Sequence, residues 1–156
     1  MKDDSFLLDS RALALKPYFS EKYLSKIITT HGIYYSSLNP KELLDKACLR
    51  HYSSKAGRKE AARKLLKFNR KTPFLISDEV GVFPTKSSKH DDCIYIFSHF
   101  FQTEPIDSKN TLITFNNDIS IKVSVSPYTV RQQKSRLHML LSHVQLSKRQ
   151  YIITPV

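Results

Sequence analysis

The order of the sequence patterns is what most constrains the fold of this chain. Two helix patterns lie between residues 39 and 68, and short runs of β-branched and aromatic residues, typical of strands, stand on both sides of them. A third helix pattern begins at Ser126-Pro127. This order predicts an α+β fold with an antiparallel sheet, two helices in the first half and one C-terminal helix. At 156 residues the chain is expected to form a single domain, residues 1–156.

The β-type runs are short, and most are bounded by turn residues. Before the first helix, strands are expected at Phe6–Leu8, at Ala12–Leu15 and on both sides of Gly32 within Lys26–Tyr35. After the second helix, strands are expected at Pro73–Ile76, Val80–Phe83, Ile94–Phe101, Thr111–Phe115 and Ile119–Val125. Asn117 and Asp118 both tolerate positive φ, so a tight turn should join the last two strands.

The first helix carries a clear start signal. Asn39 can cap it, Pro40 suits its first position, and Glu42 sits where a capping box needs it. The helix should end near Arg50 and bury Leu43, Leu44, Ala47 and Cys48. The second helix is expected over Arg58–Phe68, with Gly57 as a turn residue before it. Its expected buried side chains are Ala61, Ala62, Leu65, Leu66 and Phe68.

The positive charge of the chain is concentrated around the second helix. Residues 46–71 hold ten Lys or Arg and one acid, Glu60, whereas the net charge of the whole chain is +11. Residues 127–156 add five more Lys or Arg and no acid. Clustered charge of one sign is typical of a protein with a polyanionic partner. A solvated helix face is the alternative, but such a face normally mixes signs. The expected cationic ridge consists of Lys59, Arg63, Lys67 and Arg70.

The segment before this helix is a candidate phosphate clamp. Ser53 and Ser54 offer hydroxyl groups, and Gly57 would let the chain turn sharply. Free N–H groups at a helix start, together with Arg58 and Lys59, suit a phosphate. An ordinary turn glycine is an equally good interpretation of Gly57.

Motifs of catalysis and cofactor binding are missing from the sequence. Three glycines are too few for a P-loop or a dinucleotide fingerprint. Cys48 and His51 could share a helix face, but no third group orients them. A metal site could be imagined from four residues, but no second ligand pair at zinc-finger spacing accompanies them. The four residues are His90, Asp92, Cys93 and His99. We therefore expect no enzyme activity, no metal and no cofactor.

Targeting signals are missing as well. The first ten residues do not form a secretory signal, and no run of about 18 apolar residues could cross a membrane. Two cysteines, Cys48 and Cys93, are too few for a disulfide framework and fit a reducing compartment. The expected location is the cytoplasm.

Several separated motifs resemble one known family. The segments Leu44–Cys48, Ser53–Lys59, Lys71–Ile76 and Phe83–Ser88, followed by Cys93, resemble the competence transcription factor family (ComK) in residues and in spacing. The resemblance covers roughly residues 27 to 143. It implies a cytoplasmic, nucleoid-associated bacterial activator that binds A/T-rich DNA boxes through the minor groove as cooperating dimers and switches on DNA-uptake genes. It also implies RNA polymerase and a proteolytic adaptor as partners.

The resemblance and the charge pattern together give the expected DNA-binding residues. They are Ser53, Ser54, Lys55, Gly57, Arg58, Lys59, Arg63, Lys64, Lys67 and Lys71. Lys55 stands where the family usually has an aromatic residue. Arg50-His51-Tyr52 replaces the usual aromatic pair and glycine, so this turn should differ. Longer members continue past the last helix, so the chain resembles a short member that lacks the C-terminal extension.

The last helix offers an apolar stripe that could join two copies. The stripe consists of Leu137, Leu140, Leu141 and Val144. Packing of the same stripe onto the sheet is the alternative. Two other functions stay open at this point. One is a short paralogue that modulates a full-length activator through protein–protein contact, and the other is a nucleic-acid binder without sequence preference.

Overall fold

The computed structural model describes residues 3–87 and 89–149 and has the α+β architecture that the sequence order predicts. The strands are β1 (Ala12–Pro17), β2 (Ser25–Thr29), β3 (Gly32–Ser36), β4 (Phe74–Leu75), β5 (Gly81–Pro84), β6 (Tyr95–Phe97), β7 (Phe101–Asp107), β8 (Asn110–Phe115) and β9 (Ser120–Val123). The first six form one sheet in the order β3-β2-β1-β6-β5-β4, and the last three form a second sheet, β7-β8-β9. All recorded strand pairs are antiparallel.

Two of the predicted strands are wrong. The first, Phe6–Leu8, is largely a 3₁₀ turn, η1 (Ser5–Leu7), in which the Asp3 carboxylate accepts from the Ser5 N–H at 3.0 Å. A three-residue apolar run is too short to specify a strand against such local hydrogen bonds. The second, Ile94–Phe101, divides into β6 and β7, which belong to different sheets. The break follows Ser98, whose N–H still donates to the Gly81 carbonyl at 2.9 Å in line with the β5–β6 pairing, whereas the His99 N–H turns back to the Phe97 carbonyl at 2.8 Å.

The first helix forms as its start signal predicts. This helix, α1 (Pro40–Leu49), is capped by the Asn39 side chain, whose oxygen accepts from the Glu42 N–H at 2.9 Å. All four side chains predicted to be buried are buried. They are Leu43, Leu44, Ala47 and Cys48.

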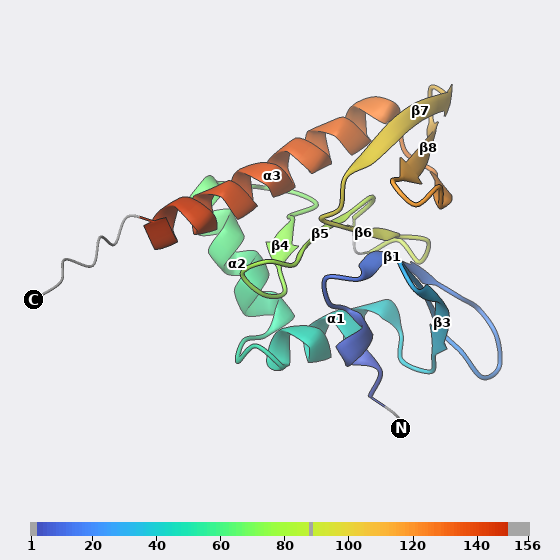
Figure 1. Ribbon diagram of the computed structural model, residues 1–156, viewed down its shortest axis with the longest axis horizontal. Coiled ribbons are helices and arrows are strands. Elements are labelled where there is room, and N and C mark those ends of the chain that lie inside the picture. The colour runs from blue at the N-terminus through green and yellow to red at the C-terminus, as the bar shows by residue number, and fades with distance from the viewer. Residues whose placement is uncertain (1–2, 88, 150–156) are drawn as a thin grey trace, which may run out of the picture.

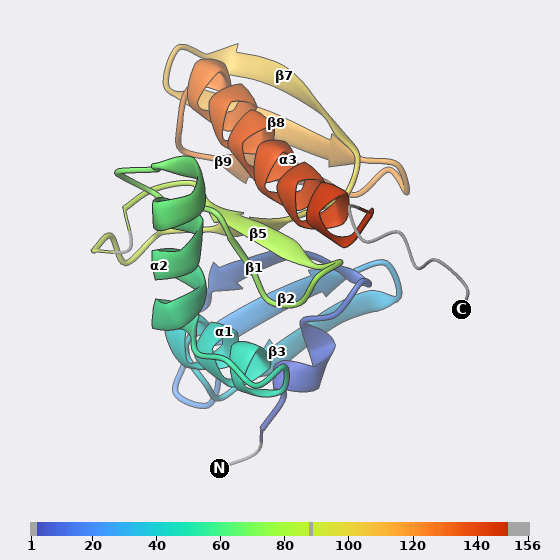
Figure 2. The ribbon, with the colours of Figure 1, turned by 90° about the vertical axis from the view of Figure 1, so that its left-hand side faces the viewer.

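The second helix, α2 (Lys55–Leu66), begins three residues before the predicted start. Ser54 caps it by accepting from the Gly57 N–H at 3.0 Å, so Gly57 lies inside the first turn and the predicted turn before the helix is wrong. Ala62 and Phe68 are buried as predicted, whereas Ala61 and Leu65 are exposed. Because α2 packs mainly against α1 and β4 at the side of the molecule, only a narrow stripe of it is covered (Figure 2).

The third helix, α3 (Pro127–Arg149), starts where the sequence predicts, with the Ser126 hydroxyl accepting from the Thr129 N–H at 3.2 Å. It lies with β7–β9 on one side of the six-stranded sheet, and α1 lies on the other side (Figure 1). The apolar core accordingly has two parts, one on each face of that sheet. At Gly81 a β-carbon would lie only 2.6 Å from Leu137 Cδ1, so glycine lets α3 approach β5 closely.

The turn between α1 and α2 contains a strained residue. Tyr52 has a φ of 60° and a fully exposed side chain. A left-handed conformation costs a side-chain-bearing residue about 1 kcal/mol relative to glycine. Tyr52→Gly should therefore raise the free energy of unfolding by about that amount in urea denaturation. Tyr52→Ala is the control and should leave stability nearly unchanged, because alanine keeps the same backbone cost. Equal effects of the two substitutions would contradict this interpretation.

Candidate nucleic-acid interface

A cleft with cationic walls lies between α2 and the segment 69–72 that leads into β4. We call it the basic cleft. Its volume is about 150 Å³, and its charged lining residues are Lys55, Lys59, Arg63, Arg70 and Lys71. Its uncharged lining residues are Asn69, Thr72, Phe74, Pro84, Ser87 and Tyr95, so no acid belongs to the lining. Such a concave surface with charge of one sign attracts anions.

The positive surface continues from the basic cleft onto α3. A neighbouring depression shares Asn69, Arg70 and Lys71 with the cleft and adds Arg136 from α3. Arg136 is not among the DNA-binding residues that the sequence predicts. The signal that could have identified it is the second basic block, residues 127–156, which has no acid. The last seven residues of that block lie outside the described residues.

Hydrogen bonds hold the basic segment against α3. Gln133 is only 2% exposed, and its amide donates to the Lys71 carbonyl at 2.7 Å and to the Pro84 carbonyl at 2.9 Å. Arg136 donates to the Gln133 side-chain oxygen, and its guanidinium lies 4.3 Å from the centre of the Phe68 ring. These contacts fix the position of the segment, so its cations are presented by a supported surface.

Lys55 contributes to the basic cleft a positive charge that is only partly exposed to solvent. It is half-buried, and its N–H donates to the Asp45 carboxylate at 3.0 Å. Burial is the main cause that lowers the pKa of the Lys55 ammonium, and the positive charges of Lys59 and Lys41 lower it further. A bound anion would relieve this repulsion.

Two backbone N–H groups of the predicted phosphate clamp at the start of α2 already have hydrogen-bond partners within the chain. The N–H of Gly57 is used by the Ser54 cap, and the N–H of Lys55 is used by Asp45. Ser54 is thus a capping residue, and the side chain of Ser53 contacts the Ser54 carbonyl only at 3.5 Å. The helix start therefore offers fewer free donors than the sequence suggested, and the cationic side chains carry the anion-binding capacity of this region.

The remaining predicted residues differ in their surroundings. Arg58 is partly buried, and its Nε has no hydrogen-bond partner among the described residues. Lys64 pairs with Glu60 at 3.3 Å on the exposed side of α2. Lys67 ends α2 with a φ of 57° and is not part of the cleft lining. Of the predicted ridge, Lys59, Arg63 and Arg70 line the cleft together.

The apolar stripe of α3 packs inside its own chain. Leu137 and Leu140 are each 3% exposed and belong to the core on the α3 side of the sheet. For these two residues the alternative of packing onto the sheet is confirmed. Leu141 and Val144 are partly buried against the same core. A dimer interface on this stripe stays a prediction, and it would have to use the parts of Leu141 and Val144 that remain exposed.

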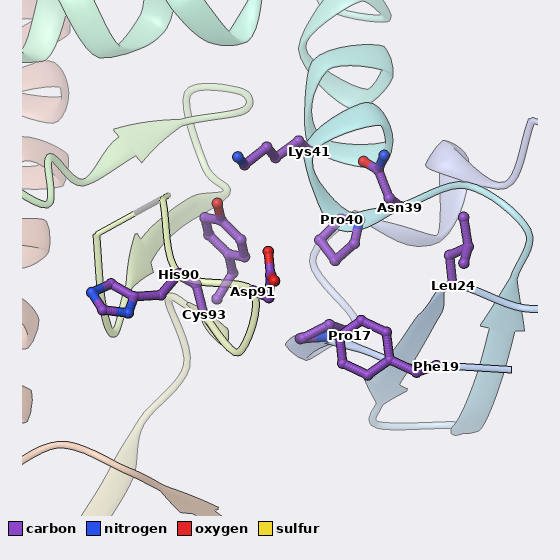
Figure 3. A pocket seen from close by; sticks show the side chains of 10 residues that line it. Pro17, Phe19, Leu24, Asn39, Pro40, Lys41, His90, Asp91 and Cys93 are labelled. Atoms are coloured by element: carbon purple, nitrogen blue, oxygen red, sulfur yellow. The ribbon is translucent and has the colours of Figure 1, made fainter.

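A second pocket, of about 210 Å³, lies between the β1–β2 loop, the start of α1 and residues 90–95 (Figure 3). His90, Asp91 and Cys93 are among its lining residues, but His90 directs its ring away from Lys41 (Figure 3). Burial raises the pKa of the Cys93 thiol, which also donates to the Lys86 carbonyl at 3.3 Å. A protonated, hydrogen-bonded thiol is a poor nucleophile.

The other candidate for thiol chemistry was the pair Cys48 and His51. Burial raises the pKa of the Cys48 thiol to about 11, whereas a nucleophilic cysteine needs a lowered pKa. His51 is exposed in the turn after α1. Within the described residues, no three His, Cys, Asp or Glu side chains come together as a metal site would require. No helix of the described chain is long and apolar enough to span a bilayer.

Comparison with known proteins gives a consistent result. The family model described as "ComK protein" matches residues 3–149, which include both sheets and the whole basic cleft. The "Competence transcription factor" of Bacillus subtilis (strain 168) is 27% identical over 146 residues, which cover 91% of this chain and 76% of that protein. No solved structure matches the chain significantly. With a match that runs through all of its described elements, the chain belongs to the ComK protein family.

Proposed function

We propose that the chain is a DNA-binding transcription regulator of competence genes, with residues 1–156 acting as one DNA-binding domain. The observation that carries this proposal is the basic cleft, in which five cations line one concave surface with no acid among them. Arg136 extends the same surface onto α3. The relative from Bacillus subtilis, a competence transcription factor, supports the same function.

The proposed target is A/T-rich DNA, contacted through the minor groove. A volume of about 150 Å³ is far too small for a duplex but suits one phosphate group of its backbone. Arg63 and Arg70 are exposed at this cleft, so their guanidinium groups would be free to enter the adjacent groove. Narrow A/T-rich minor grooves attract arginine because they concentrate negative potential.

The family resemblance supports the finer parts of the proposal. The protein would act in the cytoplasm on the nucleoid, as a homodimer, with RNA polymerase and a proteolytic adaptor as protein partners. None of these partners is needed for the first test, which uses the protein and DNA alone.

The test is fluorescence anisotropy with two duplexes of equal length, one with A/T-rich boxes and one with the boxes replaced by G/C. We expect at least tenfold tighter binding to the A/T duplex, about 1.4 kcal/mol, at near-physiological salt. Equal affinity for both duplexes, lost at higher salt, would indicate a nucleic-acid binder without sequence preference. No binding to either duplex would favour a modulator that acts through protein contact.

A third duplex tests the groove. Replacing adenine by 2,6-diaminopurine adds an amino group to the minor groove and leaves the major-groove edge unchanged. A minor-groove reader should lose most of its A/T preference on this duplex. Unchanged affinity would place the contacts in the major groove.

A further inference from the structure

The strand β3 is the outer strand of the six-stranded sheet, and its outer edge is open. It lies at the end of the molecule away from α3 and the second sheet (Figure 2). Ile33, Tyr34 and Tyr35 are 51%, 41% and 41% exposed, so both faces of the strand reach solvent. An unpaired edge strand with large apolar side chains favours pairing with a strand of another chain.

The backbone of this edge has unused hydrogen-bonding groups. A two-residue turn joins β2 to β3, and the paired residues Thr29 and Gly32 close it. The Ser36 carbonyl accepts from the Leu24 N–H at 2.8 Å and so faces the β2 side. In an antiparallel ladder the direction alternates along the strand, so Ile33 and Tyr35 point their N–H and C=O groups outward. In the described part of the chain, no other segment pairs with them.

The other sheet edges are protected in ways that β3 is not. At the opposite edge, β4 has only two residues and packs against α2 and α3. In the second sheet, the edge strand β7 carries Glu104, Pro105 and a register shift before Asp107, and the edge strand β9 carries Lys122. Charges, proline and bulges are the usual means of blocking edge-to-edge pairing. The sequence of β3, Gly-Ile-Tyr-Tyr-Ser, contains none of them.

A second copy of the chain is the partner that fits this edge. In a chain of net charge +11, β3 itself carries no charged side chain, and its nearest cross-strand cation is Lys26, opposite Tyr35 on β2. A two-fold axis would make the contact self-complementary and would close it at two copies, which prevents growth into fibres.

The available area sets the strength of the contact. The exposed apolar side chains next to this edge are Ile33, Tyr34 and Tyr35 of β3, together with Tyr18, whose ring lies 4.8 Å from that of Tyr35. Taking about 200 Å² for each large side chain, their exposed fractions amount to roughly 340 Å² per copy. A dimer would then bury about 700 Å² of side-chain surface, which fits a weak, reversible contact.

We propose that β3 pairs antiparallel with β3 of a second copy, so that the six-stranded sheets of two chains become one continuous sheet. The two-fold axis passes beside Tyr34, which faces Tyr34 of the other copy, while Ile33 faces Tyr35. This assigns a surface to the homodimer included in the proposed function, but the contact needs no DNA and is tested without it.

Engineered disulfides test the register. In a non-hydrogen-bonded antiparallel pair the Cα atoms are about 4.5 Å apart, within the range of a disulfide. Under mild oxidation Tyr34→Cys should give mostly covalent dimer, because the new cysteine faces its own copy. Ile33→Cys is the matched control and should cross-link several-fold less, because residue 33 faces residue 35. The native Cys48 and Cys93 are buried, so the wild type supplies the background.

Equal cross-linking of Tyr34→Cys and Tyr128→Cys, an exposed position on α3, would overturn the proposal. So would a monomeric wild type in sedimentation equilibrium at 100 μM, even if the edge could pair with another protein. Tyr34→Lys places two like charges face to face and should shift a wild-type dimer to monomer, whereas Tyr128→Lys should not. Affinity for a single A/T box should be unchanged in Tyr34→Lys, so a failure of the dimer and a failure of DNA binding can be told apart.

Discussion

Replacing Lys59, Arg63 and Arg70 together by alanine should weaken binding to an A/T-rich duplex by roughly 100-fold at low salt, about 2.7 kcal/mol. These three side chains line the basic cleft from α2 and from the segment before β4, and none of them forms a recorded ion pair with a described acid. Each phosphate contact that is lost also removes about 0.9 from the slope of log affinity against log salt, so the slope should flatten by about 2.7.

The matched control removes the same charge elsewhere. Lys22, Lys109 and Lys122 are exposed and lie outside the basic cleft, on the β1–β2 loop and on the second sheet. Their triple alanine variant should retain nearly all of the affinity and the slope, with a small uniform loss from the lower net charge. Equal losses in the two variants would mean that only total charge matters, and the cleft would then not be the DNA-binding site.

Arg58 is left out of this variant for a structural reason. Its Nε is buried, so its removal would change packing beneath α2 as well as charge. The effect of Arg58→Ala on DNA binding could not be separated from an effect on the fold. This problem does not arise for Lys59, Arg63 and Arg70. None of their side-chain nitrogen atoms is both buried and without a hydrogen-bond partner.

Leu137→Ala should lower the free energy of unfolding by about 2–5 kcal/mol, the usual cost of a leucine cavity in a core. Leu137 is 3% exposed and fills the space above Gly81, where its Cδ1 would lie 2.6 Å from a β-carbon. Urea denaturation followed by circular dichroism measures this loss as a lower midpoint with an unchanged slope. The effect should be independent of protein concentration, because the side chain packs within one chain.

Met139→Ala is the control on the same helix. Met139 is 51% exposed, so its removal should cost less than about 1 kcal/mol. A small effect of Leu137→Ala, or an effect that grows on dilution, would contradict the packing of α3 described above. It would instead return the α3 stripe to the role of a dimer interface.

Helix starts and turns could be predicted because their signals are local. Asn39 and Ser126 cap their helices as the sequence indicates, and Asp118 adopts the positive φ expected in the hairpin turn. Each signal depends on hydrogen bonds within about four residues, so no distant contact is needed to interpret it. The predicted start of α2 at Arg58 is wrong for a local reason as well. Ser54 caps the helix through the Gly57 N–H, so Gly57 lies inside the first turn of α2 and not in a turn before it.

The candidate site could be predicted only in part. The charge of residues 46–71 located the basic region, and Lys59, Arg63 and Arg70 do share one cleft. The cleft itself depends on Gln133, which holds the Lys71 carbonyl from 62 residues away. Arg136 joins the surface through the same long-range contacts. The basic block 127–156 could have marked Arg136 as a candidate, but no local pattern indicates that it lies beside Lys71.

The sequence by itself determined the α+β class, the three helices, the place of the excess charge and the family. Only the tertiary structure decided that residues 94–101 divide between two sheets, that Leu137 and Leu140 of α3 are core, and that β3 is an open edge. Caps, periodicity and charge act between near neighbours along the chain, so they are readable in sequence. The position of a strand within a sheet is set by pairings between distant segments, so it appears only once the chain is folded.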